Sequence, residues 1–161
     1  MQEDIVKQMG YVALATRLKR ISDKMSHSTR LMYKELAIDI EPNWYLVLIL
    51  VRDRPGISVT KIAAALGFRH QSVVIMTNKM IQAGYLHAKR DKRDKRKSLL
   101  YLTGKAIDIL PGLHKIWEVG EQVILELLNQ DITIIGILDV LEQKLDKTSF
   151  GKRIMDTIST I

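Results

Sequence analysis

The amino-acid sequence predicts a mainly α-helical fold with a small β-hairpin wing (α+β), of the winged helix-turn-helix type, whose terminal helices form a dimerisation region. Three observations support this prediction. Two short amphipathic helical patterns stand on either side of a turn at 67–69. Two strand-like runs, YLHAKR and SLLYLT, follow them and flank the basic tract KRDKRDKRK at 89–97. Longer helical patterns occupy both ends of the chain.

The N-terminal third is expected to be helical. Apolar residues recur at spacings of two to four between positions 3 and 25, which predicts an amphipathic helix there. The sequence MSHS interrupts this pattern, and Ser28 is expected to cap a second helix that continues to Ala37. Pro42 suits the first turn of a buried helix from about 43 to 52, and DRPG at 53–56 predicts a turn.

The helix-turn-helix comes next. Ser58 is expected to cap the helix VTKIAAAL, which stops at Gly67, and a second helix runs from His70 to Ala83 with Gly84 closing it. The small Ala63 is expected where the two helices cross, and the apolar Val73 is expected where the second helix meets the first. The hairpin follows with strands at 85–90 and 98–103, and it makes the wing of the fold.

Helical periodicity returns after the hairpin. A long helix with a bend at LPG is expected to reach about residue 128, and two more helices are expected at 132–146 and 149–159. The sequence contains no long repeat and no linker. We therefore predict one domain over 1–161, with a winged-helix core at about 43–103 and dimerisation helices at about 1–40 and 104–161.

Composition narrows the possible functions. The chain of 161 residues is 47% apolar and has no cysteine, which excludes disulfides, zinc-thiolate sites and thiol redox switches. Its four histidines are scattered, and no phosphate loop, nucleophile motif or carboxylate pair stands out, so we predict no metal site, cofactor or enzymatic activity. The acidic N-terminus is unlike a signal peptide, and the longest apolar run is too short to span a membrane, so a cytoplasmic location is expected.

The positive charge indicates a polyanionic partner. The net charge is +7, and the tract at 89–97 alone contributes seven Lys or Arg residues and two Asp residues. An anionic membrane would require a basic amphipathic helix, which this strand-flanked tract is not, so nucleic acid is the expected partner. The tract has no aromatic residue on which single-stranded bases could stack, which favours double-stranded DNA.

The second helix of the helix-turn-helix, named the reading helix below, has two predicted faces. The face expected in the core consists of Val73, Met76, Thr77 and Met80. The opposite face consists of Gln71, Ile75, Asn78 and Gln82, with Ser72 and Lys79 at one margin and His70 at the helix start. An isolated polar face is usually only solvated, but beside a basic wing base contact is the better interpretation. Asn78 and Gln71 are the expected base-contacting residues, and Lys79 is expected to meet phosphate.

The wing is expected to present arginine to DNA. Arg93 and Arg96 suit phosphates or a narrow minor groove, where the negative potential is enhanced. A carboxylate is repelled by phosphate, so Asp94 is expected to orient a neighbouring guanidinium. A nuclear-localisation signal would leave the flanking strands unexplained.

The stretch from Ser58 to Thr103 resembles the winged-helix core of the MarR family, the multiple antibiotic resistance regulators. SVTKIAAALGF is similar to the supporting helix, SVVIMTNKMIQAGYL to the reading helix, and RDKRDKRKSLLYLT, with its Asp94-Lys95-Arg96 step, to the wing. IEPNWYLVL, LGFRHQSVV and LPGLHKIW resemble a subgroup fused to an N-acetyltransferase domain, although this chain is expected to be a stand-alone regulator. The resemblance implies DNA contacts by Ser58, His70, Gln71, Ser72, Val74, Ile75, Asn78, Lys79, Arg93, Asp94, Lys95 and Arg96.

Three departures from the family pattern concern the reading head. Arg69 stands where a serine usually caps the reading helix, and Lys61 replaces a glutamate of the supporting helix. Val74 and Ile75 occupy positions that commonly hold polar residues, and apolar groups there can touch thymine methyl groups but cannot read hydrogen-bonding edges. The target sequence is therefore expected to differ from that of typical relatives, or to be weakly selected.

The family resemblance also implies a small aromatic or phenolic effector, bound between the dimerisation helices and the winged helix. Tyr11, Tyr33, Trp44 and Tyr45 are the candidate pocket residues, and the alternative is that their rings are ordinary core. We therefore predict a homodimeric, sequence-specific, double-stranded DNA-binding transcription regulator, a repressor that leaves a pseudo-palindromic operator when it binds this ligand. The alternative function is a dimeric winged-helix protein-interaction module without specific DNA binding.

Overall fold

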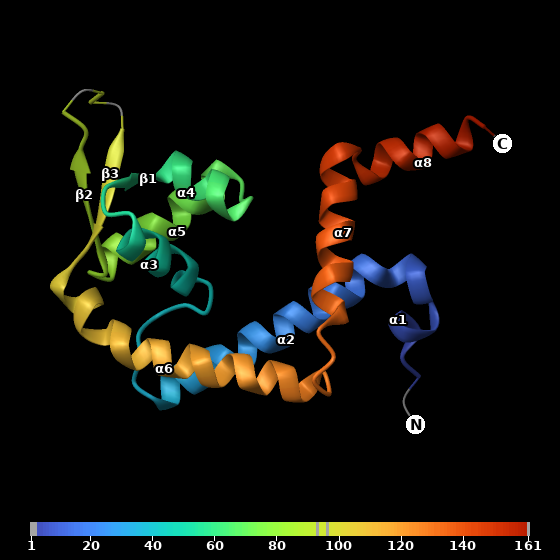
Figure 1. The fold of residues 1–161 in the computed structure, drawn as a ribbon, viewed down its shortest axis with the longest axis horizontal. Coiled ribbons are helices and arrows are strands. Elements are labelled where there is room, and N and C mark those ends of the chain that lie inside the picture. Colours follow the sequence, from blue (N-terminus) through green and yellow to red (C-terminus); the bar gives the residue numbers. More distant parts are fainter. Residues whose placement is uncertain (1–2, 93, 96, 161) are drawn as a thin grey trace. The chain divides into compact units, whose positions relative to one another are not determined.

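The computed structural model describes residues 3–92, 94–95 and 97–160, and Figure 1 shows the order of their elements. The protein is mainly helical with one small antiparallel sheet, which confirms the predicted fold class. The chain forms two compact units, residues 1–109 and residues 110–161. Within the described ranges, none of the helices combines the length and the apolar character that a membrane span requires.

The N-terminal segment differs from the prediction. A short helix α1 (Ile5–Gln8) and a 3-10 helix η1 (Gly10–Ala13) precede the long helix α2 (Leu14–Glu35). The predicted break at MSHS is wrong, because α2 continues through it and the Thr29 hydroxyl donates to the carbonyl of Met25 at 2.9 Å. The break lies at Gly10, whose φ of +56° does not fit an α-helix.

The central helices confirm the predicted helix-turn-helix. Helix α3 (Trp44–Asp53) is followed by α4 (Val59–Leu66), a three-residue turn and the reading helix α5 (His70–Gln82). The Ser58 hydroxyl accepts a bond from the Lys61 amide at 3.4 Å and so caps α4, which ends at Gly67 with a φ of +64°. Ala63 and Val73 are both buried, as expected for α4 and α5 in contact.

The wing is an antiparallel hairpin of β2 (Leu86–Arg90) and β3 (Ser98–Leu102), close to the predicted strands at 85–90 and 98–103. A strand that was not predicted, β1 (Ile57–Ser58), pairs with β3, so the sheet order is β1-β3-β2. Leu86 and Leu100 are buried where the sheet meets the helices. Two residues are too few for an alternation pattern, and β1 was therefore not apparent in the sequence.

The end of α5 is fastened to the start of the next helix, α6 (Gly104–Leu127). The Thr103 hydroxyl donates to the Gly84 carbonyl at 2.6 Å and accepts from the Ala106 amide at 3.2 Å. The Lys105 ammonium donates to the Ala83 carbonyl at 2.8 Å and lies 4.1 Å from the centre of the Tyr85 ring. We call these contacts the Thr103–Lys105 clasp. They give the last turn of α5 a cation and two hydrogen-bond donors.

The second unit contains most of α6, which continues through Pro111, and two further helices. Helix α7 (Thr133–Lys147) and helix α8 (Phe150–Ile158) agree with the predicted 132–146 and 149–159. The Ser149 hydroxyl caps α8 by accepting from the Lys152 amide at 3.4 Å. Neither α7 nor α8 contains a buried residue, and Phe150, Met155 and Ile137 are more than 60% exposed.

Candidate nucleic-acid interface

The reading helix α5 has the predicted core face. Val73, Met76, Thr77 and Met80 are its buried residues, and they recur at helical spacing on one side. The Thr77 hydroxyl, although buried, donates to the Val73 carbonyl at 2.9 Å and so needs no partner from the core. This face fixes the rotation of α5, and the rest of the helix surface is therefore turned away from the domain core.

The outward side of α5 carries the predicted base-contacting residues. Gln71, Ser72, Ile75, Asn78 and Lys79 are exposed, and Val74 is half-buried. Ile75, a large aliphatic residue between Gln71 and Asn78, is 60% exposed. The structure thus brings together on one helix every predicted contact residue between 70 and 79.

The start of α5 lacks the usual capping side chain. Arg69 occupies the N-cap position with extended backbone and makes no side-chain cap bond. Its carbonyl accepts instead from the amides of Ser72 and Val73 at 3.0 and 3.3 Å. Arg69 and His70 are both exposed at this end. The positive end of the helix dipole and a cation therefore lie at the same point, which favours an anion there.

The tip of the wing is a hydrogen-bonded turn. The Asp91 amide donates to the Lys97 carbonyl at 3.0 Å, and the Lys97 amide donates to the Asp94 carbonyl at 2.9 Å. The Asp91 carboxylate accepts from the Asp94 amide at 3.3 Å. Asp94 also lies 3.7 Å from the Lys97 ammonium. The Asp91 carboxylate therefore holds the backbone of the turn, and the Asp94 carboxylate is paired with one of its cations.

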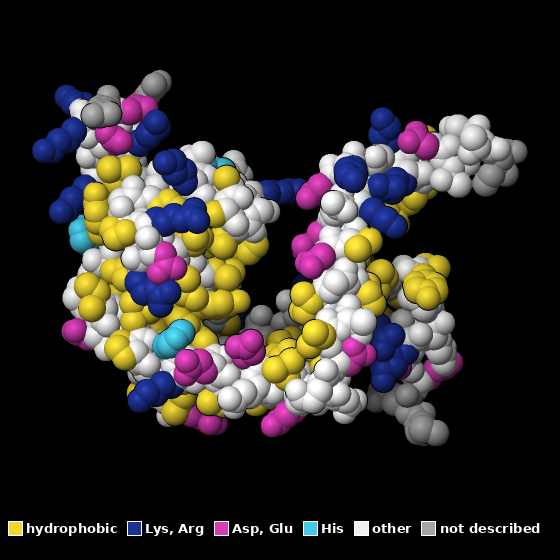
Figure 2. All heavy atoms as spheres, viewed as in Figure 1, with side chains coloured by type: hydrophobic (Ala, Val, Ile, Leu, Met, Phe, Trp, Pro, Cys, Tyr) yellow, Lys and Arg dark blue, Asp and Glu magenta, His cyan; other side chains and the backbone are white. Residues whose placement is uncertain are grey.

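The predicted wing contacts are only partly within the described residues. Lys95 is exposed and Asp94 is half-buried, whereas Arg93 and Arg96 lie outside the described residues. Figure 2 shows Lys and Arg side chains gathered at the end of the hairpin, with carboxylates among them. The described cations of the wing are thus held by a folded hairpin rather than by a loose tail.

One face of the wing also carries an aromatic cluster. His87 and Tyr101 face each other across β2 and β3, with ring centres 5.4 Å apart and planes 17° from parallel. The Lys89 ammonium lies 5.2 Å from the centre of the Tyr101 ring. These residues were not among the predicted site residues, although the alternation of the strands places 87, 89, 99 and 101 on one face.

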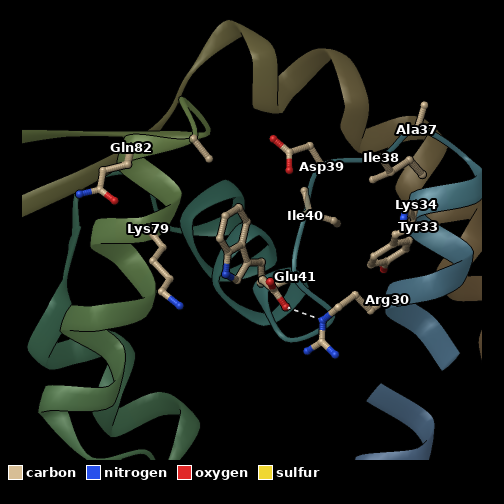
Figure 3. A pocket seen from close by; sticks show the side chains of 12 residues that line it. Arg30, Tyr33, Lys34, Ala37, Ile38, Asp39, Ile40, Glu41, Lys79 and Gln82 are labelled. Atoms are coloured by element: carbon tan, nitrogen blue, oxygen red, sulfur yellow. Dashed lines mark hydrogen bonds and ion pairs between the residues drawn. The ribbon is translucent and has the colours of Figure 1, made fainter. Parts of the chain in front are cut away.

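A pocket of about 730 Å³ lies beside the reading helix, within residues 30–83. Figure 3 shows Arg30 and Tyr33 from α2 on one side and Lys79 and Gln82 from α5 on the other, with the segment 37–41 between them. Arg30 and Glu41 are paired at 3.1 Å. The lining carries the cations Arg30, Lys34 and Lys79, the carboxylates of Asp39 and Glu41, and the ring of the buried Trp44.

The structure separates the four predicted pocket residues. Tyr33 and Trp44 line the pocket and are nearly fully buried, at 2% and 6% exposure. Tyr45, on the next position of α3, and Tyr11, which is 95% exposed in η1, do not line it. Trp44 also packs edge-on against Tyr85, with ring centres 5.8 Å apart, so it belongs to the pocket and to the core together.

Lys79 also lines the pocket, which the sequence did not predict. Its side chain extends to the pocket from the margin of α5 (Figure 3), and its phosphate contact stays a prediction. Arg30 and Lys34 were not expected at a binding site at all. They belong to α2, more than forty positions before Lys79, and no local pattern in the sequence connects two segments so far apart.

Residues 38–97 match the sequence model of the MarR family. None of the curated proteins matches the chain. The solved structure of the transcriptional repressor CouR, bound to a 23-mer DNA duplex, is 25% identical with a TM-score of 0.67, and the match covers 89% of this chain and 98% of that chain.

Two further solved structures are similar to this chain. A serine variant of MarR from E. coli, complexed with operator DNA, is 19% identical with a TM-score of 0.66, and the match covers 89% of this chain and 99% of that one. The PcaV transcriptional regulator from Streptomyces coelicolor, in complex with its natural ligand, is 19% identical with a TM-score of 0.65, over 92% of this chain and 99% of that one. The fold is therefore the MarR winged-helix fold. The resemblance to the acetyltransferase-fused subgroup stays a prediction.

Proposed function

We propose that this protein is a homodimeric regulator of transcription that binds double-stranded DNA sequence-specifically, and that it is a repressor released by a small-molecule ligand. The observation that carries the proposal is the exposed strip of α5 beside a folded cationic hairpin. The family match over 38–97 and the similarity to regulators bound to DNA support it. The protein-interaction alternative has no observation in its favour.

In the proposed complex the two elements have different tasks. The outward side of α5 enters the major groove, where Gln71 and Asn78 contact base edges. The wing tip contacts phosphates or the adjacent minor groove through Lys95 and through Arg93 and Arg96, whose contacts were predicted from the sequence. Phosphate contacts set affinity and its salt dependence, whereas base contacts set sequence preference, so the two tasks can be measured separately.

The test begins with selection of bound sites from a random DNA pool, followed by anisotropy titrations at several salt concentrations. Arg96→Ala should weaken binding to selected and random DNA alike, and it should flatten the salt dependence by about two ions per dimer. Asn78→Ala should keep that slope and relax preference at one base pair, at a cost of about 1–3 kcal/mol. Lys19→Ala, which removes a cation paired with Asp23 on α2, is the matched control. Equal binding of every sequence by the wild type would refute the proposal.

The proposed homodimer accounts for the exposed apolar residues of the terminal helices. Phe150, Ile154, Met155 and Ile158 are all exposed on α8, and Ile5, Met9, Ile21 and Met25 are exposed in α1, its C-cap and α2. Apolar faces of this extent are unfavourable in water unless a second chain covers them. Two reading helices would then lie about 34 Å apart on a pseudo-palindromic site. A monomeric mass by light scattering at micromolar concentration would contradict this assembly.

The proposed effector is a small aromatic or phenolic anion that binds in the 730 Å³ pocket. The buried Trp44 offers an aromatic contact in the wall, and Lys34 and Lys79, with Arg30 beside its partner Glu41, offer cations for a carboxylate or phenolate. In a Trp117→Phe background, Trp44 is the only tryptophan, so an aromatic carboxylate should quench its fluorescence and weaken DNA binding over the same concentration range. Quenching without any effect on DNA binding would refute the effector role.

A further inference from the structure

The outward strip of α5 contains one large aliphatic residue between two amides. Ile75 is 60% exposed, Gln71 precedes it by one helical turn, and Asn78 follows it by nearly one turn. The fully buried Val73 and Met80 lie on the opposite face, so Ile75 cannot turn into the core. In the free protein this isoleucine exposes apolar surface to water at the centre of the proposed DNA contact.

The major groove offers one apolar feature to such a side chain. Thymine carries a C5-methyl group there, whereas the other base edges present donors and acceptors. Amide side chains such as those of Gln71 and Asn78 fit the paired N6 and N7 atoms of adenine. Guanine is usually contacted by Arg or Lys, and Lys79, the only such residue in α5, extends to the pocket (Figure 3).

We propose that Ile75 determines specificity by packing against a thymine methyl group, and that the base pairs under the centre of α5 are A·T pairs. The amides of Gln71 and Asn78 hydrogen-bond to adenines on either side of this thymine. Val74 contributes less, because it is half-buried against the domain. The inference rests on the proposed DNA binding and adds to it the chemical class of base that the reading helix selects.

The test removes single methyl groups from the DNA. Each thymine of the selected half-site is replaced in turn by deoxyuridine, which changes nothing except the C5-methyl group. With the wild type, one replacement should weaken binding about fourfold, as expected for the burial of one methyl group. With Ile75→Ala, the same replacement should have no effect, while the salt dependence of binding stays that of the wild type.

Two controls separate this effect from unrelated losses. Ile107→Ala removes another exposed isoleucine, 57% exposed on α6, and it should keep the wild-type response to deoxyuridine. Ile75→Val removes only the terminal δ1 methyl group and should keep part of the fourfold response. A selected site at which no deoxyuridine weakens binding, or at which Ile75→Ala responds like the wild type, would overturn this inference and leave the proposed function standing. If no site can be selected, the proposed function fails and the inference fails with it.

Discussion

Replacing Gly56 by alanine should disturb the wing through one close contact. Gly56 lies in the turn between α3 and β1 with a φ of +81°, and its amide donates to the Leu100 carbonyl at 2.9 Å. A Cβ atom at this position would lie 2.9 Å from the Tyr101 hydroxyl oxygen and 3.3 Å from the ring carbon that carries it. Tyr101 would have to move, and it is the ring on which His87 stacks and beside which Lys89 lies.

The expected magnitude follows from two separate costs. An L-residue in the left-handed region costs about 1–2 kcal/mol relative to glycine. Overpacking against a ring that is already in contact adds about 1–3 kcal/mol. Gly67 provides the matched control, because it has a φ of +64° but open space where its Cβ would stand. Gly67→Ala should therefore lose only the backbone part of the free energy of unfolding, and Gly56→Ala should lose at least about 1 kcal/mol more.

The assay is urea unfolding followed by far-ultraviolet circular dichroism, at one fixed protein concentration because the proposed dimer makes stability depend on it. Tyr101→Phe removes the nearest atom of the contact, so Gly56→Ala should cost less in that background than in the wild type. Equal losses of unfolding free energy for Gly56→Ala and Gly67→Ala would show that the Tyr101 side chain moves aside without an energetic penalty. An unchanged loss for Gly56→Ala in the Tyr101→Phe background would show the same. Either result would refute the packing argument.

Three more predictions concern other contacts. Lys105→Met should lower the free energy of unfolding by about 1 kcal/mol, because it removes the cation from the carbonyl end of α5 and from the Tyr85 ring; thermal unfolding measures this. Asp94→Ala should weaken DNA binding in anisotropy titrations although it removes a negative charge. The reason is that the Asp94 carboxylate, 3.7 Å from the Lys97 ammonium, is expected to orient neighbouring cations of the wing; tighter binding would contradict this. The Arg20 guanidinium, 2.9 Å from Asp4, holds the pKa of that carboxyl below its ordinary value of 3.8. The pair therefore stabilises the fold above pH 3.8, and its contribution should disappear as the pH falls through the lowered pKa. Hydrogen exchange of the α1 amides, compared between the wild type and Asp4→Asn, tests this.

The sequence predicted the reading head well, because its features are local. The buried face of α5 was correct at all four residues, since one helix against one core leaves a clear periodic pattern. The stop of α4 at Gly67 and the turn before α5 also follow from neighbouring residues, because a left-handed cap needs glycine at one position.

The features that were missed depend on contacts between distant segments or on weak local preferences. The N-terminal break was placed at MSHS, but serine and histidine are tolerated inside a helix, and Gly10 was the stronger signal. Strand β1 exists because Ile57 pairs with Leu100, and nothing at 57–58 alone indicates this. The convergence of α2 and α5 on one pocket likewise arises from tertiary packing, which the local periodicity of either helix does not encode.

Ser58 has two structural roles at once, as the last residue of β1 and as the cap of α4. Strand β1 leads directly into α4 and pairs with β3, which is one of the two strands of the wing. In the proposed complex, the wing and the helix pair α4–α5 therefore act as two binding modules, and the paired strands β1 and β3 hold them at a fixed distance. When either one contacts DNA, the other is held at a high effective concentration next to its own groove, so two weak contacts yield one slow dissociation.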